Sequence, residues 1–379
     1  MTLALYLHWP FCASKCPYCD FNSHVRESVD INQWRQAFLQ ELRRHRDLGG
    51  ERRLTSIFFG GGTPSLMPPN LVQDILCEID RLWEIPPDIE ITLEANPNSV
   101  EVTNFRALAE AGINRVSLGI QSLNQDELKF LGRLHSVSEA RQAIETAVSC
   151  FKRVSFDLIY ARPNQTLEDW QAELTDALSY GTEHLSLYQL TIEPGTAFAI
   201  RHARGDFVLP TDDTAADLYD LTTHLCQGNG LINYEISNYA RPGCESQHNL
   251  AYWRYQDYAG IGPGAHGRLT LAGRRHATKQ YRAPETWLRQ ILEHNNGFDE
   301  DIILTPQEQA SEMILMGLRL NQPFDLSRLP CAAESVLDFS AIERLVKLNL
   351  IDYDGIKLKV TTTGRLCLNE ILRLIRRPE

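Results

Sequence analysis

The sequence predicts an α/β fold in which a partial (β/α)6 barrel precedes a smaller C-terminal α+β domain of winged-helix-like pattern. Three observations predict it. Short apolar segments alternate with amphipathic ones over the first half of the chain, polar or glycine-rich motifs follow the apolar segments, and the alternation fades after Gly267. Repeated βα units form a parallel sheet with helices outside it. A full barrel and a doubly wound sheet have the same pattern, so both alternatives stay open.

The predicted strands are short and apolar, as expected of parallel strands that are buried on both faces. The predicted helices between them are amphipathic, and Ser138 and Thr166 stand as start signals before acidic residues. The strands are residues 3–7, 56–59, 90–94, 115–118, 153–159 and 184–190, and the helices are residues 31–46, 69–83, 102–111, 138–150 and 167–179.

The C-terminal third has a different pattern. Residues 269–277 predict a hairpin that turns at Ala272 and Gly273, and residues 285–294 predict a helix. A winged-helix-like order of elements follows. It comprises helices at 306–318 and 334–348, strands at 350–353 and 357–360, and a helix at 363–376. We therefore expect a barrel with a ligand-binding extension over 1–267, a connecting hairpin and helix over 268–304, and the winged-helix-like domain over 305–379.

Composition excludes some classes of function. The 379 residues include 37 Lys and Arg against 49 Asp and Glu, which gives a net charge of -12. This charge disfavours nucleic acid as a partner, so the C-terminal domain is expected to act as a lid or interaction module. No apolar run approaches the roughly 20 residues that span a bilayer, and no signal peptide pattern begins the chain. We expect a cytoplasmic protein that is not an integral membrane protein.

Three cysteines, Cys12, Cys16 and Cys19, follow the first predicted strand in the spacing Cys-x-x-x-Cys-x-x-Cys. Three thiolates on one loop can hold three corners of a cubane iron-sulfur cluster and leave the fourth iron open to another ligand. A structural zinc site would need a fourth ligand, and His8 and His24 are oddly spaced for that role. Nine cysteines in all, an odd and sparse number, disfavour a disulfide framework.

Polar residues follow the other predicted strands. They are the segment 60–64 (Gly-Gly-Gly-Thr-Pro), Glu94, Gln121 and Asp157. Taken singly, these could be a flexible turn, a solvated strand end, a helix cap and a partner for a buried arginine such as Arg133. Because the carboxyl ends of parallel strands meet at one rim, we expect them to form a polar cup beside the cysteine loop. Glycines admit close backbone approach, Glu94 can pair with an amino group, and the cup suits a zwitterionic nucleoside.

The cysteine loop resembles the signature of the radical S-adenosylmethionine (SAM) superfamily. Its wider frame resembles the branch that contains oxygen-independent coproporphyrinogen III oxidases and HemW heme chaperones, over nearly the whole chain. The motifs that carry this resemblance are Tyr6-x-His8-x-Pro10-Phe11-Cys12, Gly60-Gly61-Gly62-Thr63-Pro64, Glu94-x-Asn96-Pro97 and Gly119-Ile120-Gln121-Ser122.

The resemblance implies a set of cofactor contacts and no assigned catalytic residue. A [4Fe-4S] cluster would bind Cys12, Cys16 and Cys19, and its open iron would take the amino and carboxylate groups of SAM. The SAM contacts implied by the motifs are Tyr6 and Tyr18 beside the cofactor, Gly61, Gly62 and Thr63 at its amino-acid portion, and Glu94, Gln121, Arg133 and Asp157.

Two features favour the heme chaperones within this branch. The oxidase pattern has a further cysteine two residues after the third cluster ligand, where this chain has Phe21, and it has an N-terminal arm that is not expected here. Residues 248–253, His-Asn-Leu-Ala-Tyr-Trp, match the His-Asn-x-x-Tyr-Trp element associated with heme binding. The resemblance therefore implies His248 as a heme ligand with aromatic rings beside it, although a lone histidine is more often structural.

One segment departs from the family pattern. Ala161 and Arg162 stand where the family commonly has Gly-Leu after Asp-Leu-Ile-Tyr. The change leaves Asp157 in place. It adds a cation to the loop, and we expect that Arg162 could meet an anion such as a heme propionate.

The function implied by the resemblance is a heme chaperone that binds a 4Fe-4S cluster, SAM and heme. It would deliver heme to acceptor hemoproteins, which could include membrane-bound respiratory complexes. The alternative is an oxygen-independent coproporphyrinogen III dehydrogenase that oxidatively decarboxylates its substrate by radical chemistry. A third reading is a cluster that only stabilises the fold.

Overall fold

One large sheet organises the computed structural model, which describes residues 1–26 and 28–377. Its order is β14-β13-β12-β11-β1-β4-β5-β6-β7-β8-β10-β9, and the strands from β11 to β8 run parallel. All six predicted strands are confirmed. The parallel strands are β1 (Thr2–Trp9), β4 (Arg53–Gly61), β5 (Glu90–Ala95), β6 (Arg115–Gln121), β7 (Arg153–Tyr160), β8 (His184–Gln189) and β11 (Tyr258–Ile261).

The order of the strands confirms the partial barrel. Strands β1, β4, β5, β6, β7 and β8 follow one another across the sheet in chain order, whereas a doubly wound sheet reverses direction at a switch point. The sheet stays open, because β14 and β9 end it on either side. Antiparallel strands extend both ends. They are β9 (Ile232–Asn233), β10 (Asn238–Ala240), β12 (His266–Leu271), β13 (Arg274–Gln280) and β14 (Phe298–Ile303).

The predicted hairpin is confirmed as β12 and β13, with Ala272 and Gly273 at its turn. Both turn residues have positive φ, 48° and 76°, as a tight two-residue hairpin requires. The hairpin adds two antiparallel strands next to β11, so the sheet extends beyond β1 and β11 at this edge.

The predicted helices form with small changes at their ends. The third is shorter than expected, because Asn104 separates α3 from α4. The fourth begins earlier, because Ser136 and not Ser138 caps it in a reciprocal capping box with Glu139, while Thr166 caps the fifth as expected. The helices are α1 (Ile31–Gly49), α2 (Pro69–Trp83), α3 (Ser99–Val102), α4 (Phe105–Glu110), α5 (Gln125–Phe130), α6 (Val137–Cys150), α7 (Leu167–Leu178), α8 (Ala197–Ala203), α9 (Asp212–Gly228), α10 (Gln247–Trp253) and α11 (Pro284–His294).

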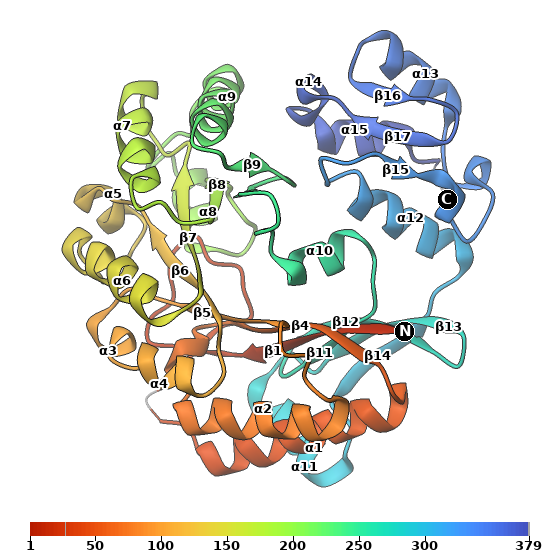
Figure 1. The fold of residues 1–379 in the computed structure, drawn as a ribbon. Coiled ribbons are helices and arrows are strands. Elements are labelled where there is room, and N and C mark those ends of the chain that lie inside the picture. Colours follow the sequence, from red (N-terminus) through yellow and green to blue (C-terminus); the bar gives the residue numbers. More distant parts are fainter. Residues whose placement is uncertain (27, 378–379) are drawn as a thin grey trace.

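Helices α1, α2 and α11 cover one side of the sheet, below it in Figure 1. The rings of Trp34 on α1 and Trp287 on α11 stack with centroids 5.4 Å apart, and both side chains are buried. Aromatic stacking of this kind adds to the free energy gained by burying the two rings. These helices pack against one face of the sheet and hold its strands in place. They do not cover the carboxyl ends of the strands, which stay accessible to a ligand.

The C-terminal unit has a hydrophobic core of its own, and α12 packs against α10 (Figure 1, upper right). Three expectations here are corrected. The helix expected from 334 begins after its cap Asp338, the last helix breaks near Cys367, and a third strand joins the wing. The elements are α12 (Pro306–Gly317), β15 (Phe324–Asp325), α13 (Phe339–Lys347), β16 (Ile351–Tyr353), β17 (Lys357–Val360), α14 (Thr362–Arg365) and α15 (Leu368–Ile375).

Two further points concern the whole chain. The domain boundaries at 267 and 304 stay predictions. Among the described residues, no helix combines the length and the apolar composition that crossing a membrane would require.

Candidate functional site

The cysteine loop lies directly after β1. It begins at β2 (Phe11–Cys12), which pairs in parallel with β3 (His24–Val25), so both ends of the loop are held together. Thr63 Oγ1 donates a hydrogen bond to Cys12 Sγ at 3.3 Å, and Arg133 Nη1 donates to Cys16 Sγ at 3.3 Å. The loop is therefore tied to the segment after β4 and to the segment after α5 by hydrogen bonds to two of its sulfur atoms.

The donor set of this loop fits a cluster better than the alternatives. All nine cysteines are free, which removes the disulfide alternative. No three His, Cys, Asp or Glu side chains of the described residues are arranged to hold a single metal ion. A cubane cluster takes each cysteine at a different iron, so its ligands need not converge on one point.

Hydrogen bonds at the loop also favour the thiolate form of two cysteines. Burial raises the pKa of Cys12 and of Cys19, while the neighbouring Ser23 hydroxyl lowers it at both thiols. Thr63 adds to this effect at Cys12, and the Phe21 backbone adds to it at Cys19. Donors to sulfur are the groups that tune iron-sulfur centres in proteins.

The glycine segment after β4 lies against the end of β5. The Gly61 amide donates to Glu94 Oε2 at 3.1 Å. A β-carbon on Gly60 would lie 2.8 Å from the Tyr6 ring and 3.2 Å from the same carboxylate oxygen, and one on Gly62 would lie 2.7 Å from the Phe11 carbonyl oxygen. Side chains therefore do not fit here, and the backbone stays open to a ligand.

Two carboxylates share this mouth of the sheet. Burial and, to a lesser extent, the neighbouring Asp157 charge together raise the pKa of Glu94 to about 8. Burial also raises the pKa of Asp157 to about 6, although Ser117 Oγ donates to Asp157 Oδ1 at 3.2 Å. The Arg115 charge lowers both values only in part. Two partly neutralised acids in one mouth favour a cationic ligand such as an ammonium group.

Arg133 connects the cysteine loop to the strand ends. It donates to the Gly119 carbonyl at 2.8 Å and to Asn96 Oδ1 at 2.5 Å, in addition to its bond with Cys16. Its Nη1 also lies 3.5 Å from the Tyr18 hydroxyl. The Nε atom of Arg133 is buried without a hydrogen-bond partner among the described residues, as expected of a site that binds a further group.

Gln121 lies in the same cluster. A β-carbon on Gly119 would lie 3.1 Å from Gln121 Nε2, 3.4 Å from Asn96 Oδ1 and 3.5 Å from Arg133 Nη2. Gln121 itself has a positive φ of 70° where β6 departs from regular pairing with β7. The backbone conformation is uncommon for a residue with a side chain, and it is typical of functional sites.

The predicted cup therefore forms. The structure brings Tyr6, Tyr18, Gly61, Gly62, Thr63, Glu94, Gln121, Arg133 and Asp157 to the same end of the sheet as Cys12, Cys16 and Cys19. Their roles in binding stay predictions.

A cavity of about 740 Å³ opens from this cup. Tyr6, Gly61 and Glu94 line one part of it, and the wall reaches residues of α10, β12 and α12. Its volume is in the range of cavities that bind cofactors and other small molecules. The rest of the lining includes the aromatic residues Phe21, Tyr188, Tyr252, Trp253, Tyr255 and Tyr258, and the cationic residues Arg268 and Arg319.

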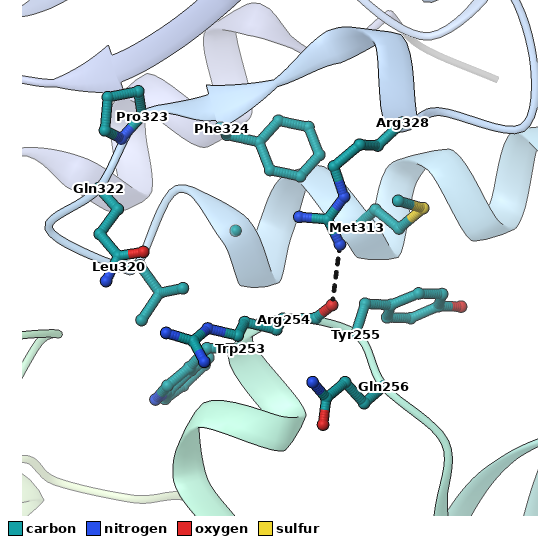
Figure 2. Close-up of a pocket in the computed structure, with 11 residues that line it drawn as sticks. Trp253, Arg254, Tyr255, Gln256, Met313, Leu320, Gln322, Pro323, Phe324 and Arg328 are labelled. Carbon is teal, nitrogen blue, oxygen red and sulfur yellow. Dashed lines mark hydrogen bonds between the residues drawn. The ribbon is translucent and has the colours of Figure 1, made fainter. Parts of the chain in front are cut away.

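A smaller pocket of about 170 Å³ lies between the segment after α10 and the C-terminal unit (Figure 2). Trp253 and Tyr255 line both hollows. Arg328 Nη2 donates to the Arg254 carbonyl at 3.3 Å across this pocket, the dashed line in Figure 2. The C-terminal unit thus contacts the segment that forms one wall of the large cavity.

His248 does not line that cavity. Its side chain is buried, with Nδ1 2.9 Å from Ser56 Oγ and Nε2 2.8 Å from the Tyr252 hydroxyl. Burial lowers its pKa to about 3, so the ring is neutral. Both nitrogens are used within the protein, and the ring can meet heme iron only if Tyr252 first moves away. The assignment of His248 as a heme ligand stays a prediction with that added requirement.

The expectation for Arg162 is wrong. Its side chain is 2% exposed and is bonded to the Glu173 carboxylate of α7, to Ser122 Oγ at 2.6 Å and to Glu127 at 3.3 Å. The guanidinium is therefore unavailable to a heme propionate. The preceding residue, Ala161, has a φ of 54°, so the position where the family has glycine keeps its left-handed conformation.

Sequence reasoning missed two residues of the site. Asn96 Nδ2 donates to Thr63 Oγ1 at 3.1 Å and accepts from Arg133, and its place in the motif Glu94-x-Asn96 was the available signal. Arg115 opens β6 and acts electrostatically on both Glu94 and Asp157, but a charge at the start of a predicted strand carries no such signal.

We expect Glu94 to make the stability of the protein depend on pH. Its pKa is raised from 4.5 to about 8 in the folded state, so between these values the folded protein binds more protons at this site than the unfolded chain. The free energy of unfolding should therefore fall as pH rises through this window. In Glu94→Gln this fall should shrink when unfolding is measured from pH 5 to 8, whereas the exposed α6 variant Glu145→Gln should keep it. Equal slopes in all three proteins would contradict the pKa shift.

Comparison with known proteins adds independent findings. Residues 6–177 match the model of the radical SAM superfamily, and residues 304–367 match the HemN C-terminal domain. The chain is 38% identical to heme chaperone HemW of Haemophilus influenzae over 98% of this chain and 97% of the relative. It is 32% identical to heme chaperone HemW of Bacillus subtilis over 97% of each chain. It is 40% identical to mitochondrial radical S-adenosyl methionine domain-containing protein 1 of Mus musculus, over 83% of this chain and 73% of the relative.

Among solved structures, coproporphyrinogen III oxidase (HemN) of Escherichia coli superimposes with a TM-score of 0.81. The match covers 98% of this chain and 89% of the other at 23% sequence identity. At this identity the likeness concerns the fold, because unrelated functions are hosted by one fold.

Proposed function

Because the chain belongs to the HemW family within the radical SAM superfamily, we propose that it is a heme chaperone. It binds heme in the cavity of about 740 Å³ and delivers it to acceptor hemoproteins. Membrane-bound respiratory complexes are among the acceptors that we expect, and the cytoplasm is the expected location.

The cluster and SAM occupy the cup beside this cavity in our proposal. Cys12, Cys16 and Cys19 hold the cluster. When bound, the cluster and SAM supply reductive radical chemistry. The chain's own residues would bind and orient SAM. The Gly61 amide holds Glu94, whose carboxylate would pair with the amino group of SAM, while Arg133 holds Cys16, Asn96 and the end of β6 in register.

Phe21 is the observation that carries the preference for a heme chaperone. This is the position where the oxidase pattern has a cysteine, and its side chain lines the large cavity with 58% of its surface exposed. A phenyl ring contributes an apolar surface to the wall and no thiol. The residue that separates the two functions in sequence therefore faces the space that a tetrapyrrole would fill.

The cavity wall matches the chemistry of heme. Aromatic rings can cover a flat porphyrin face. Trp253 Nε1 is buried without a hydrogen-bond partner among the described residues, so its N–H is available to donate a hydrogen bond to a propionate. Arg319 donates to the Leu315 carbonyl at 2.6 Å and has no carboxylate within ion-pair distance in the described part of the chain. Burial lowers its pKa, and the Glu235 charge opposes this shift. A desolvated, unpaired guanidinium favours an anionic ligand group.

Filling the cavity should weaken heme binding. In Ser237→Trp, the indole would occupy part of the space beside Ser237, which lines the cavity. We expect heme affinity to fall about 10-fold or more, since overpacking typically costs about 1–3 kcal/mol. Heme titration of the cluster-loaded protein, followed by absorbance, measures this.

The matched control is Ser149→Trp, which puts the same side chain on an exposed position of α6 outside the cavity. It should bind heme like the unmodified protein. Iron content and SAM binding of both variants report whether the fold and the cup are intact. Unchanged heme affinity in Ser237→Trp, with the fold intact, would exclude this cavity as the heme site.

A further inference from the structure

Two histidines line the large cavity, and they differ in what their rings can bind. His8 is buried, with Nδ1 2.9 Å from the Tyr6 hydroxyl and Nε2 2.9 Å from the Asn22 carbonyl oxygen. The His266 side chain is exposed to the cavity, and its ring makes no hydrogen bond to any described residue. An imidazole binds a metal through a free nitrogen lone pair, and of these two rings only His266 has one.

The backbone of His266 is held firmly although its ring is free. His266 opens β12 and pairs with Lys279 of β13. A β-carbon on Gly260 of β11 would lie 2.1 Å from the His266 carbonyl oxygen, so the two strands approach very closely there. Gly264, with a φ of 72°, turns the chain into the strand. A ligand residue on a rigid strand is positioned more accurately than one on a loop.

The neighbours of His266 suit the rest of a heme molecule. Side chains two residues apart on a strand point to the same face, which places Arg268 beside His266 on the cavity wall. Tyr258 pairs with Arg268 across the strands, and its ring packs edge-on against Tyr252 with centroids 4.4 Å apart. The wall thus combines an imidazole and aromatic surface with Arg268, whose guanidinium is paired with Glu312 of the same wall.

The protonation of His266 agrees with a ligand role. Burial lowers its pKa, and the Arg268 and Lys279 charges lower it further, while Glu300 opposes them. A lowered pKa keeps the imidazole neutral near pH 7, and the neutral ring is the form that binds a metal.

We propose that His266 is the axial ligand to the iron of heme bound in the large cavity, an assignment that rests on the proposed heme-chaperone function. The aromatic residues of the wall would then contact the porphyrin, and Arg319 and Trp253 Nε1 would be available to a propionate. His248 then has a different part: it positions Tyr252 through their 2.8 Å contact. The structure requires no rearrangement to free the His266 ring.

The test is heme binding to cluster-loaded, full-length protein, followed by absorbance and electron paramagnetic resonance of ferric heme. In His266→Ala we expect the spectral signature of imidazole ligation to be lost and affinity to fall by about 10-fold or more, the scale seen when groups that support a metal are removed. Added imidazole should restore the spectrum by entering the vacated space, which a purely structural role for His266 would not allow. His266→Gln serves as a second variant if the alanine protein does not fold.

Two control variants make the outcomes distinct. His276→Ala removes a histidine of β13 that pairs with Asp301 outside the cavity, and it should leave the heme spectrum unchanged. An unaltered spectrum in His266→Ala, or loss of the signature in His248→Ala with no imidazole rescue of His266→Ala, would overturn the assignment. Absence of heme binding by the unmodified protein would instead refute the proposed function, and the assignment with it.

Discussion

Replacing Cys16 with serine is expected to abolish the iron-sulfur cluster. A cluster with one open iron depends on three protein thiolates, and Cys16 accepts a bond from Arg133, which connects the loop to Asn96 and the end of β6. Loss of this ligand removes one corner of the cubane together with that connection. After anaerobic reconstitution, the variant should contain little iron and sulfide and should lack the cluster absorbance of the unmodified protein.

The control is Cys77→Ser, because Cys77 is an exposed free thiol on α2, away from the loop. It should retain a full cluster. Heme transfer by Cys16→Ser separates two roles of the cluster: transfer that persists with only a lower thermal stability would mean that the cluster is structural. A normal cluster in Cys16→Ser would refute the assignment of Cys12, Cys16 and Cys19 as its ligands.

Replacing Arg162 with alanine is expected to have the second largest effect, on stability. The substitution leaves the Glu173 carboxylate, whose side chain is 8% exposed, without its cation. Breaking a buried ion pair by removing one partner costs about 3–5 kcal/mol. Denaturant unfolding of variants prepared with the same cluster content should show a loss of that size, whereas heme affinity should change little because Arg162 does not line the cavity.

Arg141→Ala is the matched comparison. Arg141 pairs with Asp176, also of α7, but the two side chains are 43% and 35% exposed. Exposed pairs contribute about 0–1 kcal/mol, so this variant should unfold almost like the unmodified protein. Equal losses in both arginine variants would show that burial does not determine the effect. A loss of heme affinity in Arg162→Ala without a loss of stability would instead support a contact between Arg162 and a heme propionate, which the structure contradicts.

The sequence predicted the barrel well because its signals were local. Apolar strands such as 153–159 are short and bounded, and start signals such as Thr166 act through neighbouring residues. The strand-end cup was also predictable, because parallel strands bring their carboxyl ends to one rim regardless of helix details. Even so, Ser136 rather than Ser138 caps α6, since both are serines and only the three-residue spacing to Glu139 closes the capping box.

The rest depended on contacts between distant segments. In the sequence alone, Arg162 is predicted to be a free cation. The structure shows that α7 buries it in an ion pair with Glu173. The sequence motif predicts that His248 is a heme ligand. In the structure, α10 places His248 against Ser56 of β4, which lies nearly two hundred residues earlier in the chain. His266 follows a glycine-rich turn, and only the three-dimensional structure shows that its ring lines the cavity without a hydrogen bond to any described residue.

The most direct test of the central claim measures what the reduced, cluster-loaded protein does with tetrapyrroles in the presence of SAM. One assay follows transfer of bound heme to apomyoglobin, used as a general acceptor, by the change in heme absorbance. The other follows conversion of coproporphyrinogen III to protoporphyrinogen. The proposed function predicts heme transfer that requires an intact large cavity and no sustained protoporphyrinogen formation. Sustained protoporphyrinogen formation without heme transfer would contradict it and identify the protein as an oxidase.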